Sequence, residues 1–116
     1  MSEIIKRYQD TISLIKSNIE NNQNLKFPKI IAVSKTFKLE KILPLIDHGH
    51  IDYGENKVQE AIEKWTSIKE KKPNIKLHLI GRLQTNKVKF AIKIFDYIQL
   101  FQYLIKVNEK LYVQVL

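Results

Sequence analysis

Lys35 is the residue with the most evident chemical potential in this sequence, because it directly follows the uncharged and mostly apolar run IIAVS at residues 30–34. Such a run predicts a strand that is buried on both faces, as in a parallel sheet. The carboxyl end of such a strand is where α/β folds place their ligand sites. Partial desolvation there lowers the pKa of a lysine, and a neutral amine can add to a carbonyl to form a Schiff base. The alternative is a lysine whose charged end only reaches into solvent.

Two further predicted strand ends carry polar residues. One is the corner Gly54-Glu55-Asn56, and the other follows a strand that contains His78 and ends at Gly81, with Gln84, Asn86 and Lys87 beyond it. A glycine after a strand lets the backbone approach a flat ligand, and side-chain amides can hydrogen-bond a ring substituent without titrating. Since the carboxyl ends of parallel strands meet at one edge, these residues predict a small-molecule site. Each also has a structural explanation, Asn56 as a helix N-cap and His78 as a packed strand residue.

Several other chemistries are disfavoured. The chain has no cysteine, which excludes disulfides and thiolate sites, and its three glycines are too scattered for a phosphate loop. His48 and His50 share a turn while His78 is remote, so no metal-binding spacing occurs. Asp52 and Glu55 are predicted to form a solvated loop edge and not a general acid/base pair.

The composition is typical of one soluble globular domain of 116 residues. The net charge of +8 comes almost entirely from lysines, since only Arg7 and Arg82 are arginines. Lysines spread over helix faces disfavour a base-reading nucleic-acid interface. The sequence shows no signal-peptide pattern and no membrane span, so no membrane partner is predicted, and the missing cysteines fit a cytoplasmic location.

Strands and helices are predicted to alternate along the chain, which indicates right-handed βαβ units and a parallel sheet. The apolar spacing predicts helices over residues 3–20, 39–48, 57–68, 88–94 and 102–110, and strands over residues 30–35, 51–54, 75–81, 95–99 and 111–116. Ser2 and Asn56 are predicted N-caps, and Gly49 a left-handed C-cap. Pro44 requires either a helix that starts late enough to hold it in the first turn or a kink.

Three segments resemble successive motifs of the YggS family, the pyridoxal phosphate homeostasis proteins. They are residues 31–36 (IAVSKT), residues 52–56 (DYGEN) with 58–61 (VQEA), and residues 78–87 (HLIGRLQTNK). They occur in the family's order, and the resemblance covers roughly residues 1–100. It implies an α/β fold like the alanine racemase N-terminal domain, a (β/α)8 TIM-type barrel, of which this chain would form a part with four to five parallel strands. It also implies binding of pyridoxal 5′-phosphate (PLP).

The resemblance implies particular site residues. Lys35 would be the Schiff-base lysine, and Asn56, His78 and Gly81 would line the cofactor pocket, with no catalytic residue and no metal. One departure is Leu77, where the family usually has an aromatic residue before the histidine. Family members are about twice as long, so residues 1–116 are expected to be a single partial domain, an N-terminal half barrel without the C-terminal strands and the loop that grips the phosphate. We therefore expect weak PLP binding that is insensitive to the phosphate.

The function that the resemblance implies is intracellular PLP homeostasis without catalytic turnover, with PLP-dependent apoenzymes as possible recipients. One alternative is a non-functional remnant that self-associates through open sheet edges. A racemase-type enzyme would need a second acid/base residue facing Lys35, and no candidate is evident. A basic nucleic-acid-binding module is the remaining alternative.

Overall fold

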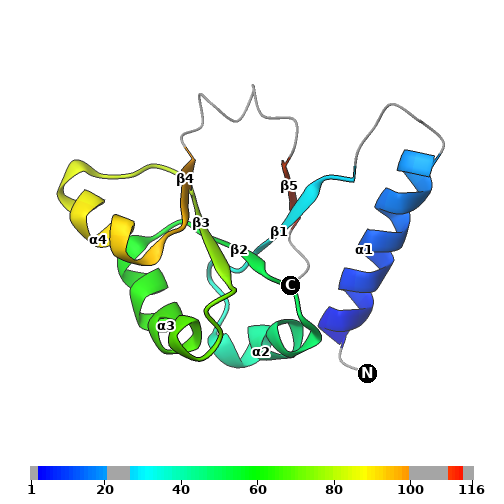
Figure 1. The fold of residues 1–116 in the computed structure, drawn as a ribbon, viewed down its shortest axis with the longest axis horizontal. Helices are drawn as coiled ribbons and strands as arrows, with labels where there is room; N and C mark the ends of the chain where they lie inside the picture. The colour runs from blue at the N-terminus through cyan, green and yellow to red at the C-terminus, as the bar shows by residue number, and fades with distance from the viewer. Residues whose placement is uncertain (1–2, 21–26, 100–109, 114–116) are drawn as a thin grey trace.

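Helices and strands alternate through most of the chain, as predicted. The structure is a computed structural model that describes residues 3–20, 27–99 and 110–113. The elements in order are α1 (Glu3–Glu20), β1 (Lys29–Val33), α2 (Leu39–His48), β2 (Asp52–Glu55), α3 (Val58–Lys71), β3 (Lys76–Ile80), the 3-10 helix η1 (Thr85–Lys87), α4 (Val88–Ile94), β4 (Tyr97–Gln99) and β5 (Lys110–Val113). Figure 1 shows the four α-helices following one another around the outside of a curved sheet.

The described strands form one parallel sheet in the order β4-β3-β2-β1-β5. Strands β1 to β4 lie in chain order, as they do in a (β/α)8 barrel, which confirms the predicted partial barrel. Strand β5 instead pairs with β1, with Lys29 opposite Lys110 and Ala32 opposite Val113. In a closed barrel that edge belongs to the last strand. The predicted strand at 111–116 is confirmed up to Val113, and the helix predicted over 102–110 lies outside the described residues except for Lys110, which is in β5.

The two faces of the sheet have different neighbours. Ala32, Tyr53 and Leu77 belong to the hydrophobic core that includes residues of the surrounding helices. The Tyr53 ring lies 4.8 Å from the ring of Trp65 on α3. On the opposite face Ile31 and Ile80 approach Gly54, where an added β-carbon would lie 2.9 Å from Ile80 Cδ1. Burial of β1 from Ile30 to Val33 confirms that this strand is covered on both faces.

The ends of the helices follow the sequence signals only in part. Gly49 caps α2 in the left-handed conformation with φ 105°, as predicted. Helix α2 begins at Leu39, so Pro44 lies inside it and the late-start alternative is wrong. Asn56 is not the N-cap of α3, because the helix begins at Val58 and Lys57 holds that position without a side-chain hydrogen bond. Ser2 lies outside the described residues. No described helix is both long and apolar enough to cross a membrane.

Candidate ligand site at the carboxyl ends of the strands

Lys35 lies in a tight turn immediately after β1. The strand ends at Val33, and the Ser34 backbone N–H continues its pairing by donating to the Gly54 carbonyl at 2.9 Å. The Phe37 N–H donates to the Ser34 carbonyl at 3.3 Å, which closes a four-residue turn around Lys35. Thr36, the third residue of this turn, has a φ of 69°, which β-branched residues rarely adopt. The half-buried Lys35 is therefore presented on a turn at the carboxyl edge of the sheet.

A buried polar network lies directly beneath this turn. Glu55 Oε2 accepts hydrogen bonds from Ser34 Oγ at 2.5 Å, from Lys64 Nζ at 3.0 Å and from Trp65 Nε1 at 3.2 Å. The Glu55 side chain is fully buried and that of Lys64 is 8% exposed. Lys64 Nζ also donates to the Ser34 carbonyl at 2.8 Å. The network thus joins the start of the Lys35 turn to helix α3.

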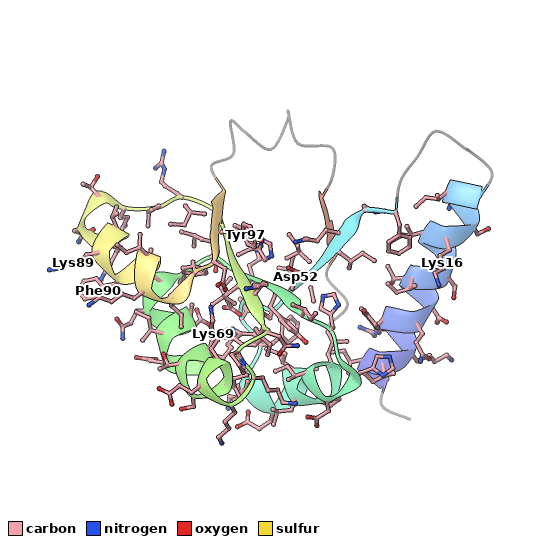
Figure 2. All side chains as sticks on the ribbon, viewed as in Figure 1. Lys16, Asp52, Lys69, Lys89, Phe90 and Tyr97 are labelled. Atoms are coloured by element: carbon pink, nitrogen blue, oxygen red, sulfur yellow. The ribbon has the colours of Figure 1, made fainter. Side chains whose placement is uncertain are left out.

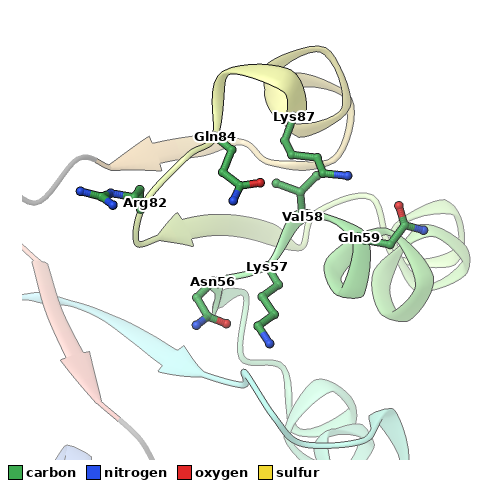
Figure 3. A pocket seen from close by; sticks show the side chains of 7 residues that line it. All are labelled: Asn56, Lys57, Val58, Gln59, Arg82, Gln84 and Lys87. Carbon is green, nitrogen blue, oxygen red and sulfur yellow. The ribbon is translucent and has the colours of Figure 1, made fainter.

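Asn56 and Gly81 lie next to each other, although they follow different strands. A β-carbon added to Gly81 would lie 3.5 Å from the Asn56 Cβ, and Gly81 has a φ of 150°, in the region that favours glycine. Beside them is a cleft of about 330 Å³, shown in Figure 3. Its lining consists of Asn56, Lys57, Val58, Gln59, Arg82, Gln84 and Lys87. Of the residues predicted around this edge, Gln84 and Lys87 therefore line the cleft, whereas Asn86 does not.

His78 lies deeper in the sheet than the other predicted site residues. It occupies the middle of β3, is fully buried, and its Nε2 lies 2.8 Å from Asp52 Oδ1. Because a carboxylate only accepts hydrogen bonds, Nε2 carries the proton in this contact. Its ring stacks on Tyr97, which is labelled in Figure 2, with centroids 4.6 Å apart. Within the described residues Nδ1 has no hydrogen-bond partner. The structure thus brings Lys35, Asn56 and Gly81 to the strand ends and places His78 below them.

Asp52 and Glu55 do not form a solvated loop edge, so that prediction is wrong. They are the first and last residues of β2, and side chains alternate between the two faces of a strand. Glu55 therefore points with Tyr53 toward α3, while Asp52 meets His78 on the other face. Burial raises the pKa of Asp52, but the hydrogen bond from His78 and the charge of Lys29 outweigh it and hold this pKa below its ordinary value.

A second histidine extends the polar cluster toward α1. His50 Nε2 donates to the Asp52 carbonyl at 2.7 Å, and the Tyr8 hydroxyl oxygen lies 2.9 Å from His50 Nδ1. Both ring nitrogens are therefore in use. Burial lowers the pKa of His50, although the Asp52 carbonyl and charge act in the other direction. Among the described residues no group of three His, Asp or Glu side chains is placed to hold a metal ion.

Comparison with known proteins identifies relatives of this chain. No protein-family model matches it. A pyridoxal phosphate homeostasis protein of Buchnera aphidicola subsp. Schizaphis graminum is 44% identical over 93 residues, which cover 76% of this chain and 40% of the relative. A protein of the same name from Haemophilus influenzae is 36% identical over 96 residues, covering 78% of this chain and 40% of the relative. The chain is a relative of the pyridoxal phosphate homeostasis proteins.

Solved structures agree with this relationship. PipY of Synechococcus elongatus PCC7942, determined both without PLP and with PLP bound, is 34% identical with a TM-score of 0.58, covering 75% of this chain and 40% of PipY. A protein of unknown function from Bifidobacterium adolescentis has a TM-score of 0.73 at 25% identity, covering 84% of this chain and 44% of its own. The chain spans about 40% of the length of the pyridoxal phosphate homeostasis proteins that it matches.

The buried network of Ser34, Glu55 and Lys64 is the feature that sequence reasoning missed. Glu55 stands inside the motif DYGEN, but its charge suggested a solvent-exposed position. The available signal was its place as the last residue of a strand, on the same face as the aromatic Tyr53. The partner Lys64 lies within a helix rich in charged residues and has no local feature that sets it apart.

Proposed function

We propose that this chain binds PLP and takes part in intracellular PLP homeostasis in the cytoplasm, holding the cofactor on Lys35 as a Schiff base without catalytic turnover. Asn56, His78 and Gly81 are the proposed pocket residues, and PLP-dependent apoenzymes are the proposed recipients. The observation that carries the proposal is the position of Lys35 on a tight turn at the end of β1. The neighbouring strand β2 leads to Asn56, which lies against Gly81.

The residues at this edge fit a flat, polar aldehyde. PLP would supply an aldehyde carbon, and the Lys35 amine is the group that would condense with it, with loss of water. Gly81 has no side chain to obstruct a ring beside Asn56, whose amide can donate or accept a hydrogen bond without titrating. Nδ1 of His78, which has no hydrogen-bond partner among the described residues, is a buried acceptor on the sheet.

The burial of Glu55 supports binding of PLP without catalytic turnover. Racemisation by two bases needs a second group, facing the lysine, that moves a proton at the substrate carbon. Glu55, the carboxylate at the end of β2, is fully buried and is bonded to Ser34, Lys64 and Trp65, so a substrate has no access to it. This arrangement is consistent with a protein that holds an aldehyde and releases it by reversal of the same step.

The proposal is tested by the absorption spectrum of the chain mixed with PLP, followed by borohydride reduction and mapping of the labelled lysine by mass spectrometry. The expected result is a Schiff-base band in the parent, absent from Lys35→Ala, with the reduced label on Lys35. Lys38→Ala is the matched control, because Lys38 is an exposed lysine close to the same turn. Equal spectra and scattered labels in all three proteins would overturn the proposal.

A further inference from the structure

The turn that presents Lys35 is anchored from below by two buried charges. The Ser34 carbonyl accepts from both Phe37 N–H, inside the turn, and Lys64 Nζ, outside it. The Ser34 hydroxyl contacts Glu55 Oε2 at 2.5 Å and the Gly54 carbonyl at 3.2 Å. Every polar atom of Ser34 is therefore committed, so the residue that immediately precedes Lys35 has a fixed orientation.

This anchor has features that packing alone does not explain. Withdrawing Glu55 and Lys64 from water is costly, and a buried ion pair is often no more stabilising than well-packed apolar residues. Glu55 Oε1 is buried without a hydrogen-bond partner among the described residues. Above the pair, Thr36 holds a φ of 69°. Unfavourable local conformations of this kind persist where the surroundings enforce them, and they cluster at functional sites.

We infer that Lys64 and Glu55 are positioning residues for Lys35: they hold the Ser34–Phe37 turn so that the Lys35 amine is presented at the end of β1. This inference rests on the proposed function. Neither side chain needs to touch the cofactor, since Lys64 acts through the Ser34 carbonyl and Glu55 through the Ser34 hydroxyl and Lys64. Loss of the anchor releases the turn and allows Lys35 to sample other orientations, which slows a reaction that depends on alignment.

Helix α3 supplies a matched control. Lys69 Nζ also bridges a carboxylate and a backbone carbonyl, Asp96 Oδ2 at 2.5 Å and the Ile94 carbonyl at 3.0 Å. It therefore resembles Lys64 in its bonding but does not contact the Lys35 turn. The experiment compares Lys64→Met and Lys69→Met by the rate of PLP labelling at Lys35 under borohydride trapping, with thermal unfolding measured alongside.

The expected result is a fall of about tenfold or more in the Lys35 labelling rate for Lys64→Met, with Lys69→Met within about twofold of the parent. Lys64→Arg, which keeps the cation, should restore part of the rate. If Lys64→Met does not fold, Ser34→Ala decides in its place, because it keeps both charges and removes only the hydroxyl contact. Equal labelling in Lys64→Met and Lys69→Met, or in Ser34→Ala and the parent, would overturn the inference.

A second readout needs no cofactor. The Phe37 amide, which closes the turn, should exchange its hydrogen about tenfold faster in Lys64→Met than in the parent. The Lys72 amide, bonded to the Ile68 carbonyl at the end of α3, should exchange at an unchanged rate. Unchanged Phe37 exchange would contradict the anchor. A parent chain that shows no selective labelling of Lys35 would overturn the proposed function and this role together, whereas selective labelling unaffected by Lys64→Met overturns only the role.

Discussion

His78 and Asp52 are joined across strands β3 and β2, with Nε2 2.8 Å from Oδ1. His78 is fully buried and the Asp52 side chain is 15% exposed, so the contact is largely shielded from water. We expect Asp52→Asn to lower the free energy of unfolding at neutral pH by about 1–3 kcal/mol, as for other hydrogen bonds to buried charged groups. Urea-induced unfolding followed by far-UV circular dichroism measures this change.

The same variant should show a defined pH dependence. Because the pKa of Asp52 is held below its ordinary value in the folded chain, its stabilisation is present above the unfolded pKa of about 3.9 and is lost as the pH falls through the folded value. The parent and Asp52→Asn should therefore become equally stable in acid. Asp47→Asn is the control, since its carboxylate is 73% exposed, and it should change stability by no more than about 0.5 kcal/mol. If Asp52→Asn were still less stable than the parent in acid, the stabilisation could not be assigned to the ionised Asp52 carboxylate.

His50 should make the folded chain sensitive to mild acid. Burial lowers the pKa of its imidazole, so the folded state favours the neutral ring. Stability is then greatest above the unfolded pKa of about 6.5 and falls as the pH drops toward the folded value. Between neutral pH and mild acid, the free energy of unfolding should therefore fall less in His50→Gln than in the parent. His48 is exposed, so His48→Gln should show the same fall as the parent. If the free energy of unfolding fell equally with pH in all three chains, the prediction would be refuted.

The order of elements was predictable from sequence, whereas the pairings that join them were not. Periodicity and Gly49 located α2 because they act through neighbouring residues. The strand at residues 111–113 was found for the same reason, but its place beside β1 depends on distant contacts that no local pattern encodes. Similarly, the buried Glu55 is paired with Lys64, a residue outside the three motifs that no local pattern links to it. Lys35 was placed correctly near the end of β1, but its turn depends on those same tertiary contacts.

Gly81 is expected to serve both stability and ligand binding. Its φ of 150° is poorly accessible to other residues, so Gly81→Ala should cost about 1–2 kcal/mol in the free energy of unfolding. The alanine would also shift the backbone at residue 81, which lies against Asn56. PLP labelling at Lys35 should therefore weaken. Gly49→Ala is the matched control, because Gly49 has a φ of 105° with open space around it at the end of α2. It should lower stability in the same way and leave labelling intact; equal labelling defects in the two variants would indicate a general effect of stability.

Binding should depend on the aldehyde of the ligand more than on its phosphate. The proposed covalent bond joins Lys35 to the aldehyde, and neither Asn56 nor Gly81, which are proposed to line the pocket, carries a charge that could pair with a phosphate. We therefore expect pyridoxal and PLP to label Lys35 with apparent affinities within about threefold of each other, a difference below 1 kcal/mol. Titrations followed by absorption measure both. The contrary result is informative, because the cleft beside Asn56 carries Lys57, Arg82 and Lys87. A strong preference for PLP that disappears in Arg82→Ala would show that this basic cleft holds the phosphate.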